Sequence, residues 1–248
     1  MFTLITGLFA MMFIIAVHEW GHLIAARMCG VPVDKFSIGM GPALVAVRDK
    51  HGTVWQISPI PFGGYVQPDE EAMKAASPAG QIFIAAAGPL FSFLLCFVLL
   101  FLLVFIEMPE TTSWFTRLTA SIDWAATSTF GFMERTVRFV AMLFGGEVPV
   151  TNLAGPVGIV HITGQQAALG WQAYVQLLAM LSVSIGILNL LPIVPLDGGR
   201  IVVGLLRYVV GDTWSQRYAI IQAVPVAVLL LCLFVTITYN DVIRIFFE

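Results

Sequence analysis

Four apolar stretches, each long enough to cross a bilayer, constrain this chain more than any other feature of its sequence. They lie at residues 2–26, 82–106, 171–196 and 218–240. The hydrocarbon core of a membrane is about 30 Å thick and takes about 20 residues of helix. Because backbone amides in lipid must be satisfied within the chain, stretches of this length predict membrane-spanning helices.

The composition supports a membrane protein and excludes one class of partner. Hydrophobic residues make up 58% of the chain and charged residues 11%, against about 45–50% and about 25% in ordinary soluble domains. The formal net charge of -3 includes no basic patch, on which nucleic-acid binding depends. We therefore predict membrane lipid as the surroundings and no nucleic-acid partner. No repeat or low-complexity linker divides the chain, so residues 1–248 are predicted to form one domain.

The segment between the first two spans has the pattern of a β-hairpin. Residues 36–47 and 53–60 are apolar and rich in β-forming residues, and a polar turn joins them. Gly63 and Gly64 follow, and paired glycines allow the backbone to approach a neighbour closely. The predicted fold class is therefore an all-α polytopic membrane protein with four transmembrane helices and a small membrane-associated β-hairpin within residues 36–66.

Residues 107–170, between the second and third spans, are predicted to form an amphipathic outer region. Apolar residues from Phe115 to Phe144 recur at spacings of three and four, which indicates a helix with one apolar face. Gly131 is a candidate break in this helix. Two interpretations remain open, a helix that lies in the outer membrane interface and an ordinary packing helix.

His18, Glu19 and His22 form an H-E-x-x-H pattern inside the first predicted span. Residues four apart on a helix return to one face, so the two imidazoles can bind one metal ion beside a glutamate that acts as general base. The alternative is two structural histidines with a paired carboxylate. Glu19 would then be costly to bury among apolar residues without a compensating group, so we favour a zinc site.

Asp197 is the candidate third ligand of that zinc ion. A catalytic zinc usually takes three protein ligands and leaves a fourth position open. Pro192 and Pro195 disrupt helical structure at the end of the third span, and two glycines follow Asp197, so its carboxylate can turn inward. The alternative role is an N-cap for a helix over residues 198–209. The H-E-x-x-H motif elsewhere in the chain favours the ligand.

The motifs and their order resemble those of the site-2 protease family of intramembrane zinc metalloproteases, most nearly the RseP-type proteases that cleave anti-sigma factors. The resemblance covers nearly the whole chain. It rests on the H-E-x-x-H motif, the Gly-Gly-Tyr after the hairpin, Ala87-Gly88-Pro89, Gly155-Pro156-Val157-Gly158, and Asn189-x-x-Pro-x-x-x-Leu-Asp-Gly-Gly.

The resemblance implies a role for each residue of the site. His18, His22 and Asp197 would be the zinc ligands, Glu19 the catalytic base, and Asn189 a residue that handles the substrate. The implied activity is a zinc-dependent endopeptidase that cleaves transmembrane segments of membrane proteins, such as anti-sigma factors or signal-peptide remnants.

Two features depart from the RseP-type pattern. Those proteases carry one or two PDZ domains between the second and third spans, and the segment available here is too short for one. Five residues before Asn189, where that group commonly has a second asparagine, this chain has Ser184. The sequence therefore predicts a site-2 type protease without a PDZ domain.

A substrate helix must unwind before its peptide bonds can be cut, and its freed amides then need partners. We predict that Gly63, Gly64 and Tyr65 bind the extended substrate as an added strand. The alternative is that this segment only caps the helices on one side of the membrane.

The distribution of Lys and Arg predicts the orientation in a bacterial inner membrane. Residues 27–80 and 197–217 contain eight of them, and the opposite side contains four. By the positive-inside rule the site faces the cytoplasm and both termini lie outside. A membrane metal-ion transporter is the rival function, since intramembrane His, Glu and Asp also mark ion pathways. A transporter often has an internal repeat, which this chain lacks.

Overall fold

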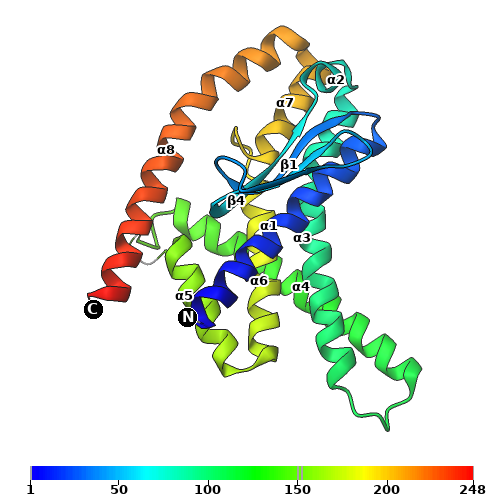
Figure 1. Ribbon diagram of the computed structural model, residues 1–248, viewed down its shortest axis with the longest axis vertical. Helices are drawn as coiled ribbons and strands as arrows, with labels where there is room; N and C mark the ends of the chain where they lie inside the picture. The colour runs from blue at the N-terminus through cyan, green and yellow to red at the C-terminus, as the bar shows by residue number, and fades with distance from the viewer. Residues whose placement is uncertain (1, 150, 152, 248) are drawn as a thin grey trace. The chain divides into compact units, whose positions relative to one another are not determined.

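The computed structural model describes residues 2–149, 151 and 153–247 (Figure 1). Helices dominate it, and a small sheet follows the first helix, as the sequence predicts. In chain order the elements are α1 (Phe2–Met28), β1 (Val33–Met40), β2 (Val45–Arg48), β3 (Val54–Ile57), β4 (Ile60–Pro68), α2 (Glu70–Ala75), α3 (Pro78–Glu107), α4 (Trp114–Phe144), α5 (Pro156–Leu169), α6 (Trp171–Asn189), α7 (Asp197–Val210) and α8 (Asp212–Phe246).

Among the described residues, four helices are long and apolar enough to cross a membrane. They cover Thr3–Met28, Pro78–Glu107, Trp171–Asn189 and Asp212–Ile245. The four predicted spans are thus confirmed, although the fourth helix covers residues 212–245 where the sequence predicted 218–240, and the third is shorter than predicted. The third helix ends at Asn189 instead of residue 196, because Pro192 disfavours helical backbone at the residue before it.

The chain folds into two compact units. One comprises residues 11–91 and 188–235, and the other residues 1–10, 92–187 and 236–248. The first contains the sheet and all the predicted site residues. The single domain expected from the sequence stays a prediction.

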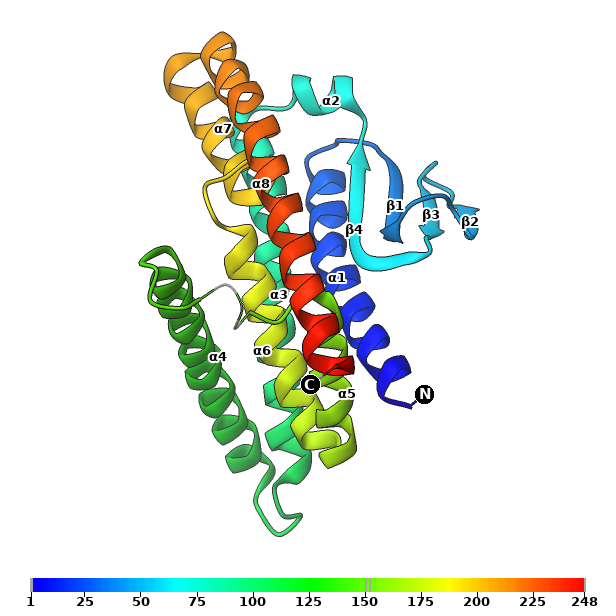
Figure 2. The same ribbon diagram turned by 90° about the vertical axis from the view of Figure 1, so that its left-hand side faces the viewer.

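The sheet has four strands in the order β2-β3-β1-β4. β2 and β3 form an antiparallel hairpin, whereas β1 pairs parallel to β3 and antiparallel to β4 (Figure 2). The hairpin predicted within residues 36–66 is therefore the outer half of a larger sheet. β4, which contains the Gly-Gly-Tyr motif, is one of the two edge strands of this sheet.

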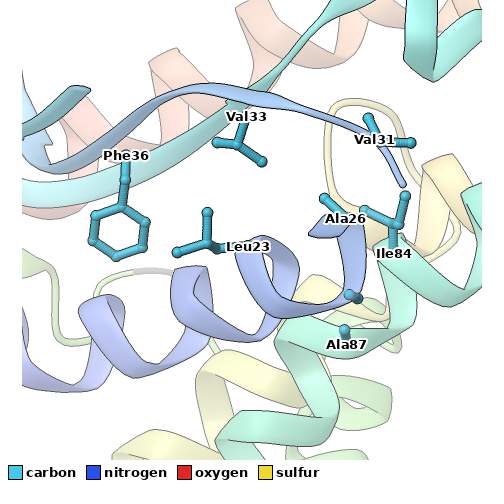
Figure 3. Close-up of a cluster of buried hydrophobic side chains, with 8 residues drawn as sticks. Leu23, Ala26, Val31, Val33, Phe36, Ile84 and Ala87 are labelled. Carbon is cyan, nitrogen blue, oxygen red and sulfur yellow. The ribbon is translucent and has the colours of Figure 1, made fainter. Parts of the chain in front are cut away.

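One face of the sheet packs on the second half of α1. Val33 and Phe36 of β1 lie over Leu23, and Ala26 contacts the same cluster (Figure 3). Ile84 and Ala87 extend this apolar cluster into α3. Burial of such side chains stabilises the arrangement by about 1.5–3 kcal/mol for each large residue. It holds β4 and α3 beside the stretch of α1 that carries the H-E-x-x-H motif.

Asp49, in the turn between β2 and β3, ties the hairpin to the C-terminal end of α1. Its Oδ2 accepts hydrogen bonds from Arg27 Nη2 at 2.7 Å and Trp55 Nε1 at 3.0 Å, and its Oδ1 accepts the backbone N–H groups of His51 and Thr53. The indole N–H of Trp55 and then the Arg27 guanidinium hold the pKa of this carboxyl well below its usual range.

The unit that contains α4 buries small residues of that helix. Ala125 packs with Cys96 and Leu100 of α3, and Thr129 Oγ1 lies 3.5 Å from Cys96 Sγ. Part of the predicted apolar stripe faces outward, since Phe115, Phe130 and Phe144 are each 70% exposed. The helix runs unbroken through Gly131. Val140 of the same stripe is buried and Met133 packs against this core, so the helix has packed and exposed apolar positions, and both interpretations of this segment stay predictions.

Asp241 near the end of α8 explains the Gly155-Pro156-Val157-Gly158 motif. Its fully buried Oδ2 accepts the backbone N–H of Gly158 in the first turn of α5 at 2.7 Å, and Arg244 Nη2 lies 3.0 Å from Oδ1. A Cβ at Gly158 would lie 2.6 Å from Asp241 Oδ1. The glycine is therefore required for the carboxylate to reach the helix N-terminus, where an anion is stabilised.

Candidate metal centre

α1 presents His18 and His22 on one face, as the spacing predicts. Both side chains are buried, with exposed fractions of 4% and 5%, and their ring centroids lie 5.0 Å apart. Glu19 is half-buried and lines the same cavity. The helix continues through the motif without interruption, so the regular backbone alone sets this arrangement.

α3 fixes the ring of His22. The Nδ1 atom of His22 lies 2.8 Å from the carbonyl oxygen of Ile84. A carbonyl only accepts, so Nδ1 carries a proton, and Nε2, which faces Asp197, is the nitrogen available to bind a metal once it is deprotonated. Sequence reasoning missed Ile84, and no side-chain signal could have revealed it, because the interacting atom belongs to the backbone.

Asp197 comes from the other end of the chain and meets both histidines. Its Oδ2 atom lies 3.1 Å from His18 Nε2 and 3.2 Å from His22 Nε2. Burial acts to raise the pKa of the Asp197 carboxyl, but the hydrogen bonds with the two histidines outweigh burial and hold that pKa well below its usual range. The carboxylate is therefore ionised, as a metal ligand must be.

The local fold explains how Asp197 reaches inward. It occupies the first turn of α7, and Leu196 is the N-cap, so the alternative role of Asp197 as the capping residue is not what the structure shows. The chain folds back so tightly here that a Cβ at Gly198 would lie 2.2 Å from the carbonyl oxygen of Leu190. The two prolines and the glycine pair thus produce the turn that the sequence indicates.

The three side chains fit a metal ion. One ligand atom from each of His18, His22 and Asp197 lies within 4.8 Å of the other two, and all three residues are buried. Two imidazoles and one carboxylate are a donor set that suits catalytic zinc. Gly88 of α3 leaves room beside them, because a Cβ there would lie 2.2 Å from His22 Nε2 and 2.8 Å from His18 Nε2. The Ala-Gly-Pro motif therefore has a direct role in the shape of the site.

Most of the predicted substrate-binding residues line the cavity around these ligands. Gly64 lies over the catalytic helix, since a Cβ there would be 3.2 Å from Glu19 Cγ. Tyr65 and Asn189 also line the cavity. Gly63 is not among its lining residues and faces Met40 instead, because neighbouring residues of a strand point to opposite sides.

Arg200 is a further residue of this cavity that the sequence argument did not single out. It lines the cavity together with Glu19 and Asp197, and its Nη1 lies 3.9 Å from Asp197 Oδ1. Its position three residues after Asp197, one turn along a helix, could have indicated that it shares a face with the ligand.

Comparison with known proteins places the chain in a family. The sequence profile of Peptidase family M50 matches residues 6–233. A Mesorhizobium japonicum protein named provisionally as a zinc metalloprotease is 29% identical, over 96% of this chain and 98% of its own length. Proteins similarly named from Fusobacterium nucleatum and Campylobacter jejuni are 28% and 25% identical, over 94% and 95% of this chain and 96% and 92% of theirs.

The alignment with the Mesorhizobium protein spans 359 positions, more than the 248 residues of this chain. That relative therefore carries residues without a counterpart in this chain. The family match covers all the sequence motifs described above, the second and third membrane-spanning helices in full, and most of the first and fourth. The chain accordingly belongs to Peptidase family M50, the site-2 protease family, and is a membrane metalloprotease.

Proposed function

We propose that this chain is a zinc-dependent endopeptidase that cleaves the transmembrane segments of membrane proteins. The observation that carries the proposal is the meeting of His18, His22 and Asp197 beside Glu19 on a helix that is itself apolar enough to span the membrane. A hydrolytic site on such a helix lies within reach of the backbone of another transmembrane helix.

His18, His22 and Asp197 would hold the zinc ion, and Ile84 would orient the ring of His22. When bound, zinc lowers the pKa of a coordinated water to about 7 and polarises a peptide carbonyl. Glu19 would accept the proton of the attacking water and pass it to the nitrogen of the leaving amine. Its half-buried side chain lines the same cavity as the metal ligands, which supports this role.

The edge strand β4 supports a mode of substrate binding. Gly64, Tyr65 and Val66 of this strand line the cavity, and β4 has a neighbouring strand on one side only. An unwound substrate that pairs with the free edge would have its peptide groups hydrogen-bonded next to the metal ligands. Asn189, at the end of α6, offers a further amide to the unwound segment. These contacts favour strand addition over the alternative of a simple cap.

The proposed location is a bacterial inner membrane, with the site toward the cytoplasm and both termini outside. The support is the eight-to-four distribution of Lys and Arg. Anti-sigma factors and signal-peptide remnants are substrates of the proposed kind. A reporter that works only in the cytoplasm should be active when inserted in the turn at residues 49–52 and silent when fused after residue 248.

The rival function, a metal-ion transporter, has less support. Within the part of the chain that the structure describes, His18, His22 and Asp197 form the one group of three or more suitable side chains that could hold a metal ion. A transport path usually needs several sites along its length.

The test is cleavage of a helical transmembrane substrate by the purified protein in detergent. Zinc should support cleavage, a chelator should abolish it, and Glu19→Gln should be inactive while it retains the metal. Glu134→Gln, which changes an exposed carboxylate on α4, is the matched control and should remain active. Unchanged proteolysis by Glu19→Gln, or metal uptake into vesicles without proteolysis, would overturn the proposal.

A further inference from the structure

Arg200 stands where the metal centre opens to its surroundings. It lines the cavity that contains the metal ligands and also the two neighbouring cavities, both of which include Lys74. Among the residues that line the central cavity, Arg200 alone carries a permanent positive charge. Arg200 is therefore the charged residue that the central cavity shares with both neighbouring cavities.

The guanidinium of Arg200 has N–H donors that are available to a ligand. Its side chain is 60% exposed, and its one ion pair in the described chain, with Asp197 Oδ1, is long at 3.9 Å. Asp197 meanwhile directs Oδ2 to both histidines. An arginine has five N–H donors and binds a carboxylate through two of them at once. Lys74, in contrast, already pairs with Glu70 at 3.4 Å.

Helix stability does not explain this position. Arg200 lies in the first turn of α7, where a positive charge opposes the helix dipole. The contact with Asp197 is too long to be a hydrogen bond and adds little to stability at this exposure. The position of Arg200 is better explained by an interaction with a negatively charged group of a bound substrate.

We propose that Arg200 forms a subsite for a carboxylate of the substrate, close to the bond that is cut. The inference rests on the proposed function. An extended chain advances about 3.3 Å per residue, so the subsite would be reached from about one to three residues away from the cut. Its ligand is the side chain of an Asp or Glu, or the terminal carboxylate of a short substrate.

The test uses a set of substrates that share one transmembrane segment. Glu, Gln or Lys is placed one, two or three residues from the cut on either side, and short substrates end in a free or an amidated carboxyl group. Cleavage is compared for the wild type, Arg200→Gln and Arg200→Glu, with metal content measured for each. Lys50→Gln removes a positive charge from the exposed hairpin turn and is the matched control.

The wild type should cleave one Glu substrate about fivefold better than its Gln partner, mainly through KM, as expected for a partly exposed ion pair. Arg200→Gln should lose this preference, and Arg200→Glu should prefer Lys. If the free terminus matters and internal Glu does not, the ligand is the terminal carboxylate. Two results would refute the proposed subsite. One is that Arg200→Glu still prefers the Glu substrate, and the other is that Arg200→Gln loses cleavage activity equally for all substrates.

A binding measurement separates this inference from the proposed function. The inactive Glu19→Gln protein, with and without Arg200→Glu, is titrated with the fluorescent Glu and Lys substrates. The Glu19→Gln protein should bind the Glu substrate with the lower Kd, and the protein that also carries Arg200→Glu should bind the Lys substrate with the lower Kd. If the wild type cleaves every substrate regardless of charge, the subsite is refuted and the protease stands. If it cleaves none, the proposed function fails, and the subsite fails with it.

Discussion

Replacement of Gly88 by alanine should remove zinc from the site although it adds only one methyl group. In a helix interior this exchange ordinarily stabilises a protein by up to about 1 kcal/mol. Here the new Cβ would lie 2.2 Å from His22 Nε2, whereas real Cβ atoms do not approach closer than 3.0 Å. The imidazole must therefore move by roughly 1 Å, while zinc–ligand distances tolerate only about 0.2 Å.

The expected loss follows from that displacement. Loss of a group that merely orients a zinc ligand costs about 10–100-fold in metal affinity. Displacement of the ligand itself should cost at least the upper value, so we expect zinc affinity to fall by about 100-fold or more. Competition with a fluorescent chelator measures the affinity, and elemental analysis of the purified protein measures the zinc content.

Gly131→Ala is the matched control, because it lies inside helix α4 and its Cβ would meet nothing closer than Arg135 Nη2 at 3.5 Å. It should keep full zinc and be equally or slightly more stable. If Gly88→Ala binds zinc with the affinity of the wild type, the packing of α3 against the two histidines does not shape the site, and our explanation of the Ala-Gly-Pro motif is wrong.

Three further predictions concern other parts of the molecule. Asn189→Leu should impair cleavage with zinc content intact, and unchanged activity would show that Asn189 is only structural. Asp49 has a depressed pKa, so its contribution to stability is present above about pH 4, the unfolded value, and is lost as pH falls through the lower folded value. Asp49→Asn should therefore make the stability of the protein less sensitive to acid, as measured by unfolding at a series of pH values. An unchanged acid dependence would contradict the role of Asp49. Asp241→Asn should lower the free energy of unfolding in detergent by about 1–3 kcal/mol, because the acceptor of the Gly158 N–H is weakened. The exposed Asp123→Asn is the control. Equal stability of both variants would show that the hydrogen bond between Asp241 and Gly158 does not stabilise the protein.

Much of the site could be predicted because its key distances are set by helical periodicity. His18 and His22 share a face of α1 for that reason alone, and the prolines and glycines around Asp197 indicate a turn toward the membrane interior. Ile84 and Gly88 could not be predicted in their roles. The first acts through a backbone oxygen, the second through the absence of a side chain, and both depend on how α3 packs against α1.

The fold was predictable to a similar depth. Hydrophobic length gives the four spans, but it cannot give the register of strands, so the parallel pairing of β1 with β3 was not foreseen. The sequence also could not predict that Phe115 and Phe130 point outward. In a membrane protein an apolar face can contact lipid, and small residues such as Ala125 and Thr129 can form the packed face instead.

The turn of α3 that carries Ile84 and Gly88 makes metal retention a measure of assembly. The Ile84 carbonyl orients the ring of His22, and four residues later Gly88 provides the space beside that ring. Both conditions hold only when α1 and α3 are packed in one register. In a preparation of this protein, the fraction of chains that keeps zinc against a weak chelator should therefore not exceed the fraction whose two helices are natively aligned. Zinc retention thus gives a quality test for refolded or detergent-exchanged samples that needs no substrate.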